Sequence, residues 1–245
     1  MISIQELRKI AKISELNIYQ QEKDYLLKLF LYFYYKTFED AVFKGGTCIK
    51  YLYGLPRFSE DLDFNITISP ETFQKQINST IKKIDLIGLK PYFLKEEKFE
   101  DAYACEIGFH GPLYQGTEQT RNKIRIDAGK RIGTIKEPAW KIIPSEYPET
   151  KENFLVKTMN EEEILIEKII SLIERNKGRD LYDTWFLLEK GIKINKKLFQ
   201  KKSKSKKIDL ENIPTEKEYI RDIEKLTYRV IPYNQITKKI REAFN

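Results

Sequence analysis

The stretch from Lys44 to Ile68 constrains the fold more than any other part of this 245-residue chain. It begins with a turn of small residues at 45–47, continues as a short amphipathic run, and ends in an alternating segment at 61–68. Apolar side chains fall on one face of that segment and polar ones on the other, which is typical of a half-buried β-strand. The stretch thus predicts a glycine turn, a short helix and a strand, in this order.

Two carboxylates, Asp61 and Asp63, occupy the polar face at the start of this strand. Side chains two positions apart on a strand point the same way, so both carboxylates converge on one place. Two hard anionic ligands beside a flexible glycine turn suit a magnesium-bound triphosphate. We therefore expect Gly45, Gly46 and Thr47 to hold phosphates through backbone amides and a hydroxyl group.

A third carboxylate, Asp127, ends the alternating segment 123–127, where it shares a face with Arg125. If this segment neighbours the strand of the first two acids, all three meet at the edge of one sheet, as two-metal phosphoryl transfer requires. Arg57 and Ser59 lie close enough in sequence to contact phosphate oxygens. Arg57 equally suits a surface ion pair.

The order of predicted elements is helices, a strand-rich middle, and helices again. Apolar residues recur at helical spacing over 3–38 and over most of the chain after Asn160. Prolines punctuate the stretch that follows the strands. We predict N-terminal helices at 1–38 that pack on a core at 39–135, an extended linker at 136–158, and a helical C-terminal lobe at 159–245.

Two predicted helices in the C-terminal part carry further charged residues. Lys168 lies at the edge of the apolar stripe of the helix at 161–175, where its stem can be buried while its ammonium group reaches an inward site. Asp180 and Asp183 lie three positions apart on one face of the next helix. The alternative interpretation is an ion pair between Lys168 and Asp180 that ties the two helices together.

A formal net charge of +7 favours an anionic partner. Between Lys190 and Lys207 there are nine lysines and no acidic residue, which suits either a solvated loop or contacts with a nucleic-acid backbone. The candidate RNA contacts are Lys201, Lys202, Lys204, Lys206 and Lys207. Two cysteines are too few for a disulfide framework or a zinc site. Because the chain lacks a signal peptide and a membrane-spanning run, we expect it to be cytoplasmic.

Together these segments resemble the AbiEii/AbiGii toxin family of nucleotidyltransferases, the toxins of type IV toxin–antitoxin and abortive-infection systems. The resemblance extends from about Phe43 to Leu188. It rests on Lys-Gly-Gly-Thr at 44–47, Arg-Phe-Ser-Glu-Asp-Leu-Asp-Phe at 57–64, the strand ending at Asp127, the helix with Lys168, and Arg-Asp-Leu-Tyr-Asp at 179–183.

The resemblance implies a bilobed α/β (α+β) protein, with the mixed sheet of the nucleotidyltransferase superfamily flanked by helices and followed by a helical lobe. It implies transfer of a nucleoside monophosphate from a nucleoside triphosphate (NTP) to the 3′ end of tRNA, which prevents charging and blocks translation. The implied site residues are Asp61, Asp63 and Asp127 on Mg²⁺ or Mn²⁺, with Asp127 as general base or third ligand, Lys168 on the triphosphate, and Asp180 as a site-forming residue. We further expect a separately encoded antitoxin, a monomeric state and no contact with a membrane.

Two other functions stay open at the level of sequence. One is a non-catalytic RNA- or protein-binding module on the same fold, although clustered carboxylates are unfavourable and their retention argues for use. The other is a metal-dependent nuclease, in which the glycine turn would have no purpose.

Overall fold

A computed structural model of the chain describes residues 1–130, 133–150, 153–203 and 213–244. The chain divides into two compact units. We call the first the sheet unit; it comprises residues 1–52, 60–133 and 139–158. The second, the helical unit, comprises residues 53–59, 134–138 and 159–245. None of the helices in the described residues combines the length and apolar character that crossing a membrane requires.

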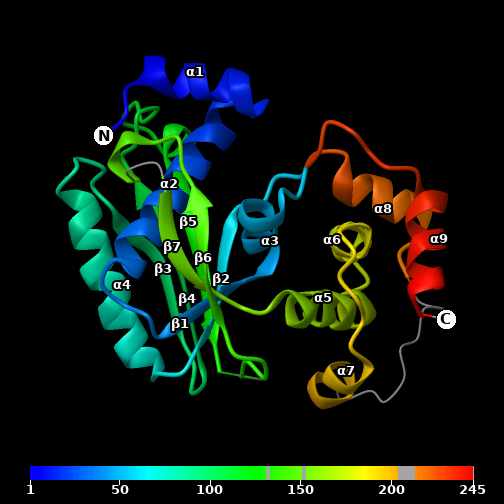
Figure 1. Cartoon of the computed structure of the whole chain (residues 1–245). Coiled ribbons are helices and arrows are strands. Elements are labelled where there is room, and N and C mark those ends of the chain that lie inside the picture. The colour runs from blue at the N-terminus through cyan, green and yellow to red at the C-terminus, as the bar shows by residue number, and fades with distance from the viewer. Residues whose placement is uncertain (131–132, 151–152, 204–212, 245) are drawn as a thin grey trace. The chain divides into compact units, whose positions relative to one another are not determined.

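Seven strands in the described residues form the sheet. They are β1 (Ala41–Lys44), β2 (Asp61–Ile66), β3 (Tyr92–Lys98), β4 (Ala102–Phe109), β5 (Asn122–Gly129), β6 (Ala139–Pro144) and β7 (Asn153–Thr158). Figure 1 labels these strands, whose order across the sheet is β3-β4-β5-β2-β1-β7-β6. β2 runs parallel to β5 and β1 parallel to β7, whereas the other neighbours are antiparallel. The sheet is therefore mixed, and β2 lies near its middle.

An aromatic core joins the sheet to its helices. These are α1 (Ile4–Ser14), α2 (Ile18–Tyr35), α3 (Gly45–Tyr53) and α4 (Pro70–Asp85), with short 3-10 turns at η1 (Glu118–Thr120) and η2 (Pro148–Thr150). The ring of Tyr34 in α2 lies 6.0 Å from that of Phe64 in β2 and 5.9 Å from that of Phe73 in α4. Because Phe64 faces this core, the alternate residues Asp61 and Asp63 lie on the opposite face of the sheet.

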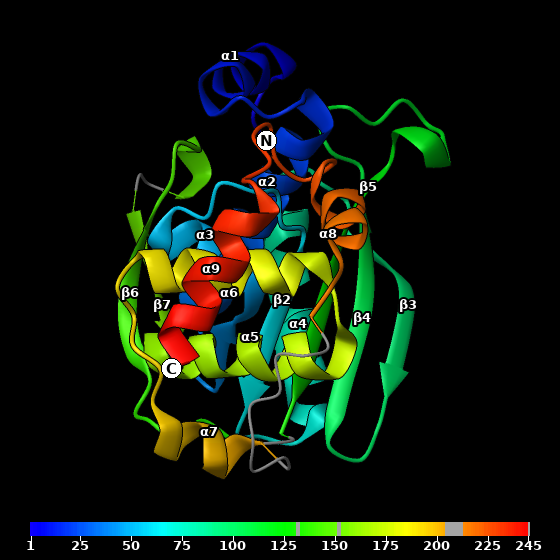
Figure 2. The ribbon, with the colours of Figure 1, turned by 90° about the vertical axis from the view of Figure 1, so that its right-hand side faces the viewer.

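The helical unit is built around α6. Its helices are α5 (Glu161–Arg175), α6 (Gly178–Glu189), α7 (Lys196–Lys202), α8 (Glu216–Ile223) and α9 (Tyr233–Phe244). α6 contacts α5, α8 and α9 (Figure 2). On α5 the buried Ile166 and Ile169 recur at helical spacing, and burial of each such side chain contributes roughly 1.5–3 kcal/mol.

The predicted α/β class, with a mixed sheet flanked by helices and further helices after it, is confirmed. At the start of α4, the side chains of neighbouring residues explain why a helix begins there. The Ser69 side chain accepts a hydrogen bond from the Thr72 amide, and Pro70 occupies the first turn, where its missing amide hydrogen has no consequence.

The stretch 136–158 differs from the predicted extended linker, because it contributes β6 and β7 to the sheet. Its prolines lie at or outside the strand ends: Pro144 is the last residue of β6, and Pro148 begins η2. Prolines at such positions leave the ladder of backbone hydrogen bonds intact. Alternate residues of β7, including Phe154 and Val156, are buried, as one covered face requires.

Candidate active site

Two parallel strands bring three carboxylates to one face of the sheet. β2 and β5 pair with Asp63 opposite Asp127 and Asp61 opposite Arg125. Neighbouring strands lie about 4.8 Å apart, and residues in register on a sheet share a face. The two strands whose adjacency the sequence left open are thus neighbours, and all three acids lie on the side away from the aromatic core.

The glycine turn lies directly against this acidic face. Gly45 adopts φ +78°, a conformation that side chains with a Cβ atom rarely adopt. A Cβ atom at this position would lie 2.1 Å from Oδ2 of Asp63 and 2.9 Å from its Cβ atom. Glycine is therefore needed at position 45 for two reasons: the left-handed backbone conformation and the close approach of the turn to Asp63.

Thr47 links the glycine turn to Asp61. Its hydroxyl group is buried and donates a hydrogen bond of 2.6 Å to the backbone carbonyl of Asp61. Gly46, also buried, precedes it in the first turn of α3. The hydroxyl group thus fixes the start of β2, and the predicted contact of Thr47 with phosphate stays a prediction.

The acidic face carries an excess of negative charge. The pKa of Asp61 is raised to about 6 by burial first and then by the neighbouring carboxylates of Asp63, Glu60 and Asp127, while Lys23 lowers it. Partial burial beside like charges disfavours ionisation. A divalent cation would relieve this repulsion, and oxygen ligands of this kind fit Mg²⁺ or Mn²⁺.

The third acid is engaged by its neighbour on β5. Nε of Arg125 lies 2.7 Å from Oδ2 of Asp127, and a terminal nitrogen of the same guanidinium lies 3.0 Å from Oδ1. Within the described residues, no three His, Cys, Asp or Glu side chains are gathered closely enough to hold a metal ion. The donor set and its placement fit a divalent cation, but the side chains are not yet assembled around one point.

A buried acid on α2 anchors the helix that follows the glycine turn. Asp24 lies 2.6 Å from Nζ of Lys50 and accepts a hydrogen bond from Tyr51, both in α3. Burial opposes its ionisation, but Lys50 and then Lys28 outweigh burial, so the pKa of Asp24 is lowered. The sequence analysis missed this residue. No local pattern marked it, because Asp24 ends the polar run Gln-Gln-Glu-Lys-Asp at 20–24, just before the apolar part of the helix begins.

In the helical unit, Arg57 and Lys168 share one buried carboxylate. Nε and a terminal nitrogen of Arg57 each lie 2.6 Å from an oxygen of Asp183, and the other terminal nitrogen donates to the Phe58 carbonyl at 2.9 Å. Nζ of Lys168 lies 2.8 Å from Asp183. Burial raises the pKa of Asp183, but Arg57 and Lys168 outweigh it and lower the value to about 2.

Asp180 differs from Asp183 in the partners of its two carboxylate oxygens. Its Oδ1 lies 2.8 Å from Arg175 and 3.6 Å from Nζ of Lys168. Its Oδ2 is buried and has no hydrogen-bond partner among the described residues. Lys168 does tie α5 to α6, mainly through Asp183, and the sequence could not show which aspartate it would choose.

The predicted phosphate contacts in segment 53–59 also belong to the helical unit. Arg57 makes a buried ion pair in place of the surface pair considered above. Ser59 is half-buried at the end of the segment. Contacts of both residues with phosphate stay predictions, as do the roles of Lys168 and Asp180 in catalysis.

The lysine-rich segment contains one lysine with a structural role. The side chain of Lys202 is 1% exposed, and its Nζ lies 2.6 Å from carboxylate oxygens of both Glu163 and Glu167. A lysine enclosed in this way is not available to a nucleic-acid phosphate, so the RNA-binding prediction no longer includes it. Lys201 is exposed. Lys204, Lys206 and Lys207 lie outside the described residues.

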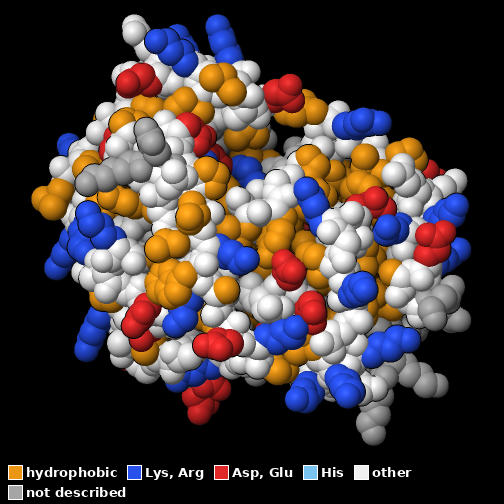
Figure 3. Space-filling view, in the orientation of Figure 1, with side chains coloured by type: hydrophobic (Ala, Val, Ile, Leu, Met, Phe, Trp, Pro, Cys, Tyr) orange, Lys and Arg blue, Asp and Glu red, His pale blue; other side chains and the backbone are white. Residues whose placement is uncertain are grey.

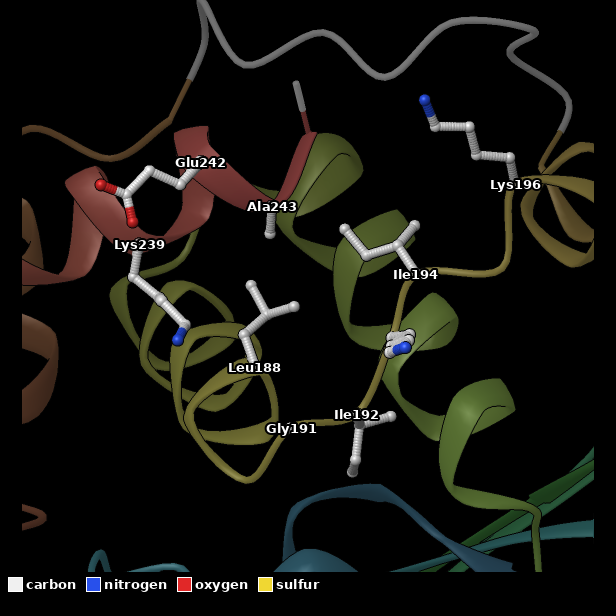
Figure 4. A pocket seen from close by; sticks show the side chains of 9 residues that line it. Leu188, Gly191, Ile192, Ile194, Lys196, Lys239, Glu242 and Ala243 are labelled. Carbon is white, nitrogen blue, oxygen red and sulfur yellow. The ribbon is translucent and has the colours of Figure 1, made fainter.

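Other lysines of the segment border a pocket of about 440 Å³ in the helical unit (Figure 4). Its walls are apolar at Leu188, Ile192 and Ile194, and its charged residues are Lys193, Lys196, Lys239 and Glu242. On the face drawn in Figure 3, Lys and Arg side chains are interspersed with Asp and Glu side chains among the described residues. The basic character of the chain is thus not gathered into one broad patch on that face.

A protein-family model matches residues 33–241 of the chain. The model is described as nucleotidyl transferase AbiEii toxin, type IV toxin–antitoxin system. The match includes both strands of the acidic face, the glycine turn, α5 and α6.

Solved structures with the same fold include proteins from two bacteria. MenT4, a nucleotidyltransferase toxin from Mycobacterium tuberculosis, is 16% identical, with a TM-score of 0.68 over 97% of this chain and 88% of that one. JHP933 from Helicobacter pylori is 16% identical, with a TM-score of 0.58 over 90% of this chain and 88% of the other. No curated protein matches the sequence significantly. At these identities the structures establish the fold, and the family model establishes the relationship.

Proposed function

Because the chain belongs to the AbiEii family of nucleotidyltransferase toxins, we propose that it transfers a nucleoside monophosphate from an NTP to the 3′ end of tRNA. The observation that carries this proposal is the packing of the Gly45 turn against Asp63, with Asp127 in register on the next strand. Phosphate-binding amides and metal-binding carboxylates are thus adjacent on one face, as transfer of a nucleotide requires.

In this proposal Asp61, Asp63 and Asp127 would hold Mg²⁺ or Mn²⁺. The cation would neutralise phosphate charge and lower the pKa of the attacking hydroxyl group. The amides at the start of α3, including those of Gly46 and Thr47, would bind phosphate oxygens, because the first amides of a helix have no partner within it.

The reaction forms one bond and breaks one. The 3′-hydroxyl oxygen of the acceptor bonds to the α-phosphorus of the NTP, the bond to the β-phosphate oxygen breaks, and pyrophosphate leaves. The hydroxyl proton needs an acceptor, and Asp127 is the candidate if it does not serve as a ligand. Arg125, its present partner, would have to release it in either role.

Lys168 and Asp180 enter the proposal through the family resemblance. Lys168 would neutralise the triphosphate, although it is now paired with Asp183. The buried oxygen of Asp180 without a partner among the described residues supports a function beyond the helix–helix ion pair. A separately encoded antitoxin, a monomeric state and action in the cytoplasm complete the proposal.

The test is incubation of the purified protein with each α-³²P-labelled NTP and tRNA, with Mg²⁺, Mn²⁺ or EDTA. We expect tRNA lengthened by one or a few nucleotides on a denaturing gel, and no product with EDTA. Asp61→Ala and Asp63→Ala should abolish transfer. Glu106→Gln is the matched control, since Glu106 lies on the same face and pairs with Lys123.

Three outcomes would contradict the proposal. Shortened RNA would indicate a nuclease. Triphosphate binding without any product would indicate a binding module. Transfer that survives both aspartate substitutions would mean that the active site lies elsewhere.

A further inference from the structure

Arg125 contacts the acidic face of the sheet unit directly. Its guanidinium engages both oxygens of Asp127, at 2.7 and 3.0 Å. Asp127 lies opposite Asp63, and Arg125 lies opposite Asp61, so the four side chains occupy adjoining positions on two paired strands. Both carboxylate oxygens of Asp127 are therefore occupied by the guanidinium.

The next basic residue along β5 behaves differently. Lys123 shares the face of Arg125, and its Nζ lies 2.7 Å from Glu106 on β4. That pair does not involve the three acids, although Glu106 also lies opposite Arg125. Arg125 therefore supplies positive charge where the divalent cation is proposed to bind.

The pair of Arg125 and Asp127 is placed so that it can open. The two side chains are 46% and 36% exposed, and an ion pair in contact with water is weak because solvent screens it. A divalent cation carries twice the charge of a guanidinium and therefore attracts the Asp127 carboxylate more strongly. A guanidinium released beside bound phosphates would find a new partner of matching geometry, since it binds phosphate with two parallel hydrogen bonds.

We propose that Arg125 exchanges partners during loading of the site: it holds Asp127 in the metal-free protein, gives Asp127 up when a divalent cation binds, and then pairs with a phosphate oxygen of the substrate. The inference rests on the proposed function, since it requires the metal and the substrate.

The first test measures Mn²⁺ affinity by electron paramagnetic resonance without nucleotide or RNA. An exposed pair contributes up to about 1 kcal/mol, which corresponds to about a fivefold change in affinity. Arg125→Ala should therefore bind Mn²⁺ about fivefold more tightly than the wild type. Arg125→Lys, which keeps the charge but loses the two-pronged contact, should be intermediate. Lys123→Ala should match the wild type and so control for a general change of charge on β5.

The second test measures KM for the NTP and for tRNA separately. Arg125→Ala should raise one of them about tenfold, as expected for the loss of a charge-assisted hydrogen bond. A rise for the NTP would identify the triphosphate as the new partner, and a rise for tRNA would identify the RNA backbone. Tighter metal binding combined with weaker substrate binding is a pattern that a purely structural arginine would not produce.

Unchanged or weaker Mn²⁺ affinity in Arg125→Ala would overturn the first half of the inference, and unchanged KM values for both substrates would overturn the second. Either result leaves the proposed function intact. A wild-type protein that binds no Mn²⁺ would overturn the proposed metal site and this inference together. An Asp61→Ala variant that has lost Mn²⁺ binding provides the reference for that comparison.

Discussion

Replacing Gly45 by alanine tests whether the glycine turn and Asp63 depend on their close approach. The left-handed conformation alone disfavours alanine by about 1–2 kcal/mol. The added methyl group would also lie 2.1 Å from Oδ2 and 2.9 Å from Cβ of Asp63. Rotation of the side chain can move the oxygen but not the Cβ atom, so the turn and β2 must move apart. Overpacking of this kind costs about 1–3 kcal/mol, which gives a total loss of about 2–5 kcal/mol.

Gly88 provides a matched control in the same unit. It has φ +87°, and a Cβ atom there would meet no other atom within 4 Å. Gly88→Ala should therefore lose only the conformational part, about 1–2 kcal/mol. The difference between the two variants isolates the contact with Asp63.

The assay is urea unfolding combined with Mn²⁺ titration. Gly45→Ala should be less stable than Gly88→Ala and should lose at least about tenfold in Mn²⁺ affinity, because a 1.4 kcal/mol distortion of one ligand has that effect. Gly88→Ala should keep the wild-type affinity. If the two variants lost the same stability and bound Mn²⁺ equally well, the close approach would have no functional importance.

Three further predictions concern buried or crowded charges. The pKa of Asp61 is raised to about 6 in the folded protein, so the stability linked to its protonation is present below about pH 4 and is lost as the pH rises through 6. Asp61→Asn should thus raise the melting temperature at pH 8 with EDTA but not at pH 4, and an equal gain at both values would contradict the assigned repulsion. Lys202→Met should lower the free energy of unfolding in urea by about 3–5 kcal/mol, because it leaves two carboxylates around an apolar group. The control Lys201→Met, at an exposed position, should change it by no more than about 0.5 kcal/mol. Similar losses in both variants would refute the structural role of Lys202. Asp183→Asn should also lose about 3–5 kcal/mol, because two buried cations share its carboxylate. Asp180→Asn should lose less stability but abolish nucleotide transfer, and the reverse ranking would exchange the roles of the two aspartates.

The sequence predicted the parts of the site that depend on local periodicity. Alternation at 61–66 placed Asp61 and Asp63 on one face, and the small residues after β1 marked the turn. Sequence alone could not decide whether β2 and β5 are neighbours in the sheet. A shift of one residue in their register would turn Asp127 to the opposite face, and register is set by packing of the whole sheet.

Ion-pair partners were predictable only when they were local. Arg125 and Asp127 lie two apart on one strand, so their contact follows from the pleat. Arg57 and Asp183 are 126 positions apart, and no local pattern connects them. For the same reason the sequence suggested phosphate contacts for Arg57, whereas the structure shows a guanidinium already engaged by a buried carboxylate.

The route of the chain between its two units has a consequence for synthesis. The sheet unit holds residues up to 158, but segment 53–59, which links the glycine turn to β2, belongs to the helical unit. Its partners are Asp183, bound by Arg57, and Leu226, whose carbonyl accepts from the Phe58 amide. A ribosome that has completed every strand of the described sheet has therefore not yet made Asp183 and Leu226, which fix this link. Nascent chains would carry all three acids while the segment between the glycine turn and β2 still lacks its partners Asp183 and Leu226, so this segment can reach its final contacts only after the helical unit has been made.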